Sequence, residues 1–170
     1  MRPVIIIAIV LGTISAIVAG VLLLFFPVYV VTSGDPVPVM REGGLEGYNQ
    51  TVVYISGVGL LADIADTPEK KTVGLGVRES MDEGEAMLFP FETEGRHSFW
   101  MQGMKFPIDI IWLDSDKTVV HIEPQLAPCT PLDCPSYQPD QNAMYVLETV
   151  AGFSEKWGVT EGTTTEFHLE

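Results

Sequence analysis

The longest hydrophobic run lies near the amino terminus. No charged side chain occurs from Pro3 to Val31, and Val4–Phe26 is almost continuously Ile, Val, Leu, Ala and Phe. Crossing a bilayer takes roughly 20 apolar residues, whereas the apolar part of a signal peptide has about 7–15, followed by a small-residue cleavage site. No polar face interrupts the run, which argues against a buried core helix. We therefore predict a retained membrane anchor over residues 1–31, with a cleaved signal peptide as the alternative.

The few basic residues around this run predict its orientation. Arg2 precedes it, and the next basic residue is Arg41. Because positively charged flanks stay in the cytoplasm, we expect a cytoplasmic amino terminus in the cell membrane and an extracytoplasmic remainder. Residues 32–50 are rich in Gly and Pro and poor in apolar side chains, which is typical of a linker. Residues 51–170 then form the predicted domain.

Beyond residue 50, short apolar runs alternate with turn residues. Runs rich in Val, Ile, Leu and aromatic residues predict strands, and they are Thr51–Ile55, Val58–Ala65, Ala86–Phe91, Phe106–Leu113, Thr118–Glu123, Met144–Val150 and Thr163–Leu169. Thr67-Pro68-Glu69 is typical of a helix start, and a second short helix is expected over Gly152–Trp157, ended by Gly158. The fold class we predict is α+β and mostly β, a small barrel-like or sandwich-like domain.

The charge of the chain narrows the classes of partner. The formal net charge is −14, and because Arg2 contributes +1 to the first 31 residues, the remainder carries −15. So acidic a surface repels phosphate backbones, which argues against nucleic-acid binding. It also disfavours peripheral docking on anionic lipid. Cations and positively charged partners remain compatible with it.

A series of motifs resembles a known family. They are Ala65-Asp66-Thr67-Pro68-Glu69, Gly74-Leu75, Arg78-Glu79-Ser80, Met87-Leu88-Phe89-Pro90-Phe91, Phe99-Trp100-Met101, Pro107-Ile108-Asp109-Ile110-Ile111, Pro128-Cys129, Cys134-Pro135, Tyr137, Tyr145-Val146-Leu147-Glu148 and Ala151-Gly152. In this order, over about residues 60–167, the chain resembles domain-of-unknown-function family 192, a group of uncharacterised proteins. The resemblance implies a compact β-rich domain, often behind a signal or anchor, and implies no reaction. Gly76 and Met104 depart from the family pattern.

Two cysteines lie in a proline-rich loop. Cys129 and Cys134 are the only cysteines, and prolines from Pro124 to Pro139 surround them. Outside the cytoplasm such a pair most often forms a disulfide, which is our prediction. A redox-active dithiol would more typically have a C-x-x-C spacing. A thiolate metal site would need further ligands.

One segment carries soft metal donors. His97, Met101 and Met104 lie within eight residues, and His121 could approach them through the predicted hairpin. Imidazole and thioether together suit copper, particularly Cu(I). Met and aromatic residues beside an apolar strand usually pack in a core instead. We therefore expect no cofactor, and copper at these four residues is the alternative.

Asp109 is surrounded by Ile108, Ile110 and Ile111 in a predicted strand. A buried carboxylate requires hydrogen bonds or a charged partner. The structural interpretation supplies backbone amides or a nearby arginine, Arg78 or Arg96. The functional interpretation is a site carboxylate with a shifted pKa, and strand alternation could also turn it to solvent.

Glu148, in the apolar run Met144–Val150, allows the same interpretations. With Asp109 it completes a candidate functional surface whose other members are Trp100, Met101 and Tyr137.

These observations favour a binding or assembly module over an enzyme. The sequence has no Gly-rich phosphate loop, G-x-S-x-G, H-E-x-x-H or dinucleotide fingerprint. We therefore expect a membrane-anchored extracytoplasmic module, an accessory subunit of a membrane complex whose partners are other subunits. The alternative is a metal-binding protein or enzyme that uses Asp109 with His97 and His121, or the Cys129 and Cys134 pair.

Overall fold

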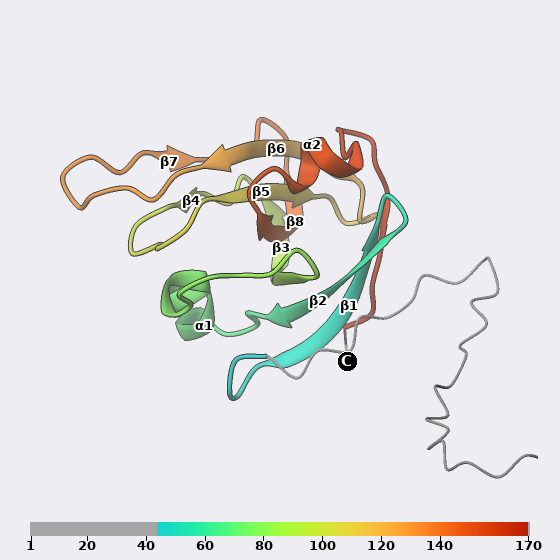
Figure 1. The fold of residues 1–170 in the computed structure, drawn as a ribbon. Coiled ribbons are helices and arrows are strands. Elements are labelled where there is room, and N and C mark those ends of the chain that lie inside the picture. Colours follow the sequence, from blue (N-terminus) through green and yellow to red (C-terminus); the bar gives the residue numbers. More distant parts are fainter. Residues whose placement is uncertain (1–43, 170) are drawn as a thin grey trace, which may run out of the picture. The chain divides into compact units, whose positions relative to one another are not determined.

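A computed structural model describes residues 44–169 of the chain (Figure 1). Seven strands form one sheet in the order β6-β5-β8-β3-β2-β1-β9. Their bounds are β1 Asn49–Ile55, β2 Val58–Ile64, β3 Glu85–Gly95, β5 Ile108–Leu113, β6 Val119–Leu126, β8 Ala143–Val150 and β9 Thr165–Glu166. With two short α-helices, the domain is α+β and mostly β, as predicted from the strand pattern.

The first hairpin follows from its turn. Ser56 and Gly57 have φ values of 48° and 78°, the left-handed conformations that a two-residue hairpin turn requires. β1 and β2 therefore pair antiparallel in register. All other pairings in the sheet are also antiparallel except β2 with β3. This parallel pair needs a crossover connection.

The crossover contains helix α1, Pro68–Val73, and the 3-10 turn η1, Gly74–Val77. The Thr67 side chain caps α1 by accepting a hydrogen bond from the Lys70 amide, which confirms the predicted helix start. Gly74 ends the helix with a φ of 51°, a conformation that glycine adopts without strain.

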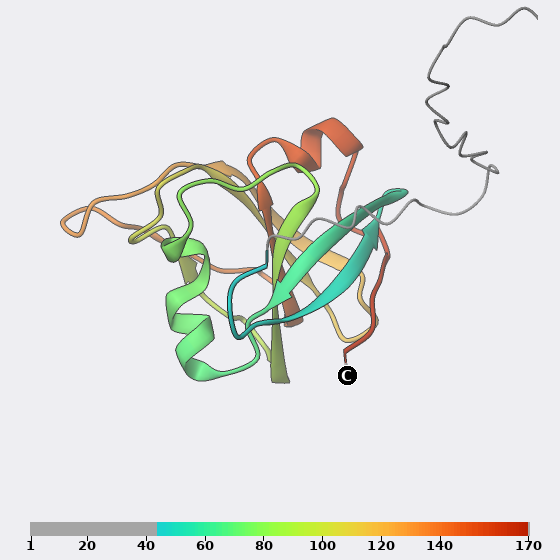
Figure 2. The same ribbon diagram turned by 60° about the horizontal axis from the view of Figure 1, so that its bottom comes forward.

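The main sheet separates two hydrophobic clusters. Side chains alternate along β5, so that Ile111 and Leu113 enter the first cluster while Ile110 and Trp112 enter the second. Helix α2, Phe153–Trp157, packs on the first cluster through Phe153. Leu75 of η1 packs in the second. Figure 2 shows the two α-helices on opposite sides of the sheet.

The carboxyl-terminal segment curves the sheet into a half barrel. β9 pairs with β1. Just before β9, the Thr163 carbonyl accepts from the Val119 amide, and at the start of β9 the Thr165 amide donates to the Lys117 carbonyl. The segment thereby links the β1 edge to the start of β6. Ladder pairing covers only Thr165–Glu166, so the strand is shorter than the predicted Thr163–Leu169.

A two-stranded arm is separate from the main sheet. β4, Phe99–Trp100, pairs with β7, Ser136–Tyr137. Beside it, Cys129 and Cys134 form the expected disulfide, with a Cα–Cα distance of 5.0 Å. The arm projects beyond the main sheet in both views (Figure 1 and Figure 2).

The predicted proline-rich loop begins later than expected. Pro124 lies inside β6 rather than in the loop. β6 is an edge strand of the main sheet, where a proline removes no needed hydrogen bond. The pairing of β5 with β6 shifts register between Ile108 and Ile110, and Gln125 has a φ of 52°.

The first strand begins shortly before residue 51, the expected start of the domain. β1 begins at Asn49, and both Leu45 and Tyr48 pack against the second cluster. The carboxyl-terminal part of the expected linker is therefore structured. The predicted anchor, residues 1–31, lies outside the described residues. Over residues 44–169, no helix has the length and apolar character needed to cross a membrane.

Candidate functional site

Asp109 is completely buried, and its carboxylate accepts three backbone hydrogen bonds. The Gln125 and Gly152 amides donate to Oδ1 at 2.8 and 2.9 Å, and the Ser154 amide donates to Oδ2 at 2.8 Å. These bonds join β5 to the bulge in β6 and to the first turn of α2. Charge-assisted bonds of this kind satisfy a buried carboxylate. The structure therefore places Asp109 in the structural role, with backbone amides rather than an arginine as partners.

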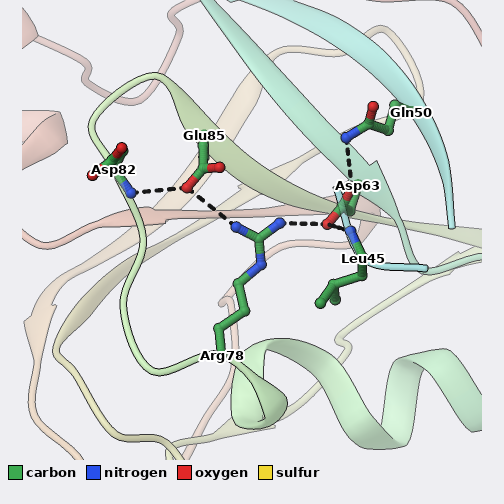
Figure 3. A network of polar contacts seen from close by, with 6 residues as sticks. All are labelled: Leu45, Gln50, Asp63, Arg78, Asp82 and Glu85. Carbon is green, nitrogen blue, oxygen red and sulfur yellow. Dashed lines mark hydrogen bonds and ion pairs between the residues drawn. The ribbon is translucent and has the colours of Figure 1, made fainter. Parts of the chain in front are cut away.

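A second buried carboxylate, Asp63 on β2, is the centre of a polar network (Figure 3). It accepts from the Leu45 amide at 3.1 Å, from Gln50 Nε2 at 2.8 Å and from Arg78 Nη2 at 2.5 Å. Arg78 Nη1 is also 3.2 Å from Glu85 Oε2. The network attaches the segment before β1 and the crossover segment to the sheet.

Sequence reasoning missed Asp63, although the signal was the same one that singled out Asp109: a carboxylate within an apolar strand. Neither suggested arginine contacts Asp109. Arg78 pairs with Asp63, and Arg96 Nη2 lies 3.6 Å from an Asp140 carboxylate oxygen. Both carboxylates on β2 and β5 are therefore satisfied.

Glu148 on β8 differs from both. Its side chain is only 4% exposed, and its flanking partners in register are Met87 on β3 and Ile110 on β5, both apolar. Within the described residues its carboxyl group makes no hydrogen bond or ion pair, and Oε2 is fully buried. Burial without a partner raises the pKa of Glu148 to about 8. At pH 7 this side chain is therefore predominantly an uncharged carboxylic acid.

Glu148 lines a cavity of about 250 Å³ between α1, η1 and the arm. We call it the aromatic cavity, because Phe89, Phe91, Phe99 and Trp100 all lie in its wall. Its lining residues are Lys71, Thr72, Val73, Gly74, Leu75, Phe89, Phe91, Ser98, Phe99, Trp100, Gln102, Met104 and Glu148.

Lys71 of α1 and Glu148 are the two ionisable side chains among these lining residues. The Lys71 ammonium lies 4.6 Å from the centre of the Phe91 ring, a cation–π contact. Across the described part of the chain, no carboxylate lies within ion-pair distance of Lys71. The cavity thus contains a carboxylic acid and an ammonium group, neither of which has a hydrogen-bond partner among residues 44–169.

The candidate surface residues are brought together only in part. Trp100, 58% exposed, lines the aromatic cavity with Glu148, and Met104 lines it too. Tyr137 is the register partner of Phe99 in the arm. Met101 is fully buried in the second cluster. Asp109 belongs to the opposite face of the sheet, where α2 packs.

The two candidate histidines have separate surroundings. The His97 ring stacks on Phe91 with centroids 3.5 Å apart, and burial lowers the pKa of His97. His121 lies beside Trp112 and 3.2 Å from a Glu123 carboxylate oxygen. Neither shares a site with Asp109. In residues 44–169, no cluster of three or more His, Cys, Asp or Glu side chains is arranged to hold a metal.

A family profile provides independent support for the resemblance that the sequence motifs indicate. The profile of family DUF192, described as an uncharacterized ACR, matches residues 51–167. The chain belongs to the DUF192 family. A UPF0127 protein of Thermococcus kodakarensis is 31% identical over 99 residues, which are 58% of this chain and 59% of the relative. A UPF0127 protein of Thermococcus gammatolerans is 31% identical over 100 residues, 59% of this chain and 61% of the relative.

The chain therefore spans about three fifths of the length of these curated DUF192 relatives. Two solved structures share its fold. One is a Sinorhizobium meliloti 1021 protein described as a proposed transcription regulator, with a TM-score of 0.64, 25% identity, and coverage of 73% of this chain and 98% of that one. The other is a Novosphingobium aromaticivorans protein of unknown function, with a TM-score of 0.63, 22% identity, and coverage of 79% and 94%.

Proposed function

We propose that this DUF192 protein is a membrane-anchored extracytoplasmic binding module whose ligand site is the aromatic cavity. The observation that carries the proposal is Glu148. A buried polar group without a hydrogen bond costs about 1–3 kcal/mol, so a protein that keeps one gives up stability. Buried acids with raised pKa values in clefts are typical of functional sites. A ligand that bonds Glu148 would remove this cost.

The surroundings of Glu148 support binding better than catalysis. A ligand pocket is typically apolar and aromatic with a few converging polar groups, which describes the aromatic cavity. Lys71 is the other ionisable group there, and no histidine or second carboxylate lines it. The alternative enzyme or metal site would need either Asp109 and the histidines together or the two cysteines free. Asp109 binds amides elsewhere, and the cysteines are bonded to each other.

The membrane anchor and the role as an accessory subunit rest on the sequence. The uncharged run of residues 1–31 supports the anchor, and the acidic remainder argues against nucleic acid as a partner. The acidic charge likewise argues against a role in transcription regulation, by which the Sinorhizobium protein is described. A module on the outer face of the membrane would present its bound ligand to neighbouring subunits.

The test is to purify the full chain from its own membranes in mild detergent and to identify bound small molecules and proteins by mass spectrometry. The variant Ser98→Phe fills the cavity mouth, and Ser80→Phe adds the same ring at an exposed position outside the cavity. We expect a small molecule with the native chain and with Ser80→Phe, but not with Ser98→Phe. Equal recovery from all three, or no bound molecule from any, would count against the proposal. Membrane proteins recovered in stoichiometric amounts would identify the complex.

A further inference from the structure

The aromatic cavity indicates the chemical class of its ligand. Among residues 44–169, the two ionisable groups in its wall, Lys71 and Glu148, have no hydrogen-bond partner, and both can donate a hydrogen bond. Lys71 is an ammonium, and Glu148 is an uncharged acid that can donate its proton. A ligand that satisfies both must present acceptor oxygens. A carboxylate offers two oxygens with about four lone-pair sites, and it would also complement the charge of Lys71.

Much of the remaining wall is apolar and favours an apolar ligand body, although Thr72, Ser98 and Gln102 also line it. Phe89, Phe91, Phe99 and Trp100 supply ring surface, and Met104 supplies a thioether. The volume of about 250 Å³ lies below the roughly 300–1,000 Å³ of pockets that hold drug-sized ligands. The ligand is therefore small.

We propose, building on the proposed function, that the aromatic cavity binds a small monocarboxylic acid with an apolar body. Its carboxylate accepts hydrogen bonds from Glu148 and Lys71, and its body packs against the aromatic rings. The acidic net charge of the protein opposes an anion at long range, but at physiological ionic strength charges more than about 8 Å apart are largely screened. Lys71 is the basic side chain among the residues that line the cavity.

A cation is the competing occupant, because aromatic rings and an acid also suit an alkylammonium group. Two observations favour the acid. Lys71 already places an ammonium on the Phe91 ring and would repel a second one. A cation would also require Glu148 to lose its proton, which its buried environment resists.

The pH dependence separates the two ligands. Around Glu148, β3 and β5 contribute apolar Met87 and Ile110, and the arm contributes no charged lining residue. His97, stacked behind Phe91, has a lowered pKa and stays neutral above pH 7. The pKa of Glu148, which burial raises to about 8, lies between pH 7 and 9.

The experiment is calorimetric titration of the full chain in lipid nanodiscs with three probes that have nearly the same shape. They are 3,3-dimethylbutanoate, its alcohol 3,3-dimethylbutan-1-ol, and choline. At pH 7 we expect the carboxylate to bind about tenfold or more tightly than the alcohol, since charge-assisted bonds are the stronger kind. Choline should bind most weakly. From pH 7 to pH 9 the carboxylate affinity should fall about tenfold as Glu148 ionises.

Two variants test the named residues. Glu148→Gln keeps a hydrogen-bond donor without a titrating proton, so carboxylate binding should persist and lose its dependence on pH between 7 and 9. Lys71→Met removes the charge but keeps an unbranched side chain, so the carboxylate should lose its advantage over the alcohol. A merely structural role for Glu148 would leave the pH profile unchanged.

Four results would overturn the ligand class. Choline binding most tightly, or an affinity that rises with pH, would make the cavity a cation site. Equal binding of the acid and the alcohol would leave only an apolar cavity. Absence of binding for all three probes at millimolar concentration would also refute it. In each case the proposed binding function is tested separately, by whether a small molecule is recovered with the native chain.

Discussion

The buried acid Glu148 should make the stability of the domain depend on pH in a characteristic direction. Its folded pKa is about 8 against an ordinary value of 4.5. Between these values the unfolded chain has released the proton while the folded chain retains it. Stability is therefore unaffected below pH 4.5, falls as the pH rises toward 8, and levels off above that. One pKa unit corresponds to about 1.4 kcal/mol, so the loss at pH 7 should be about 3 kcal/mol.

The substitution Glu148→Gln isolates this effect, because the amide does not titrate. We would measure urea unfolding of the full chain and of this variant from pH 4.5 to 9, followed by tryptophan fluorescence, to which the fully buried Trp112 contributes. The difference between the two free energies of unfolding cancels the other titrating groups. It should change by about 3 kcal/mol between pH 4.5 and 7 in favour of the variant.

A matched control is Glu92→Gln, which changes an exposed glutamate on β3. Its difference from the native chain should stay nearly constant over the same pH range. A flat difference curve for Glu148→Gln would refute the reasoning, since it would mean that Glu148 ionises in the folded domain as readily as in the unfolded chain. The cavity would then contain a carboxylate at pH 7 and not a donor.

Three further predictions concern stability, each measured as the free energy of unfolding at pH 7. Asp109→Ala leaves three amides without an acceptor and should cost about 4 kcal/mol; a loss below about 1 kcal/mol would contradict its role. Arg78→Met should cost about 4 kcal/mol because it leaves Asp63 as a buried unpaired charge, and adding Asp63→Asn should recover part of the loss; no recovery would argue against this pairing. Replacing Cys129 and Cys134 by serine should cost about 2 kcal/mol for so short a loop, and unchanged stability would show that the disulfide does not constrain the arm.

Hairpins and helix starts could be predicted from the sequence because each depends on a few consecutive residues. The hairpin at Ser56-Gly57 and the helix start at Thr67-Pro68 depend on residues that adjoin each other in the chain. The membership of the family also followed from motifs. The arm was missed because β4 and β7 have two residues each, too few to show an alternating pattern.

The candidate site depended on contacts between distant segments. A carboxylate in a strand could be recognised at Asp109 and Glu148, but the sequence could not say which was satisfied. The amides of Gln125 and Ser154 approach Asp109 from 16 and 45 residues away. Lys71, from the crossover helix, lines the same cavity as Glu148. Only the folded structure shows that Asp109 has hydrogen-bond partners and that Glu148 lines a cavity.

The most direct test of the account is an experimental structure of the full chain purified from its own membranes without added ligand. The account predicts a small molecule in the aromatic cavity, with an oxygen within hydrogen-bond distance of Glu148 and of Lys71. A cavity in which the Glu148 carboxyl instead bonds to a protein group, with no small molecule beside it, would contradict the assignment of this site.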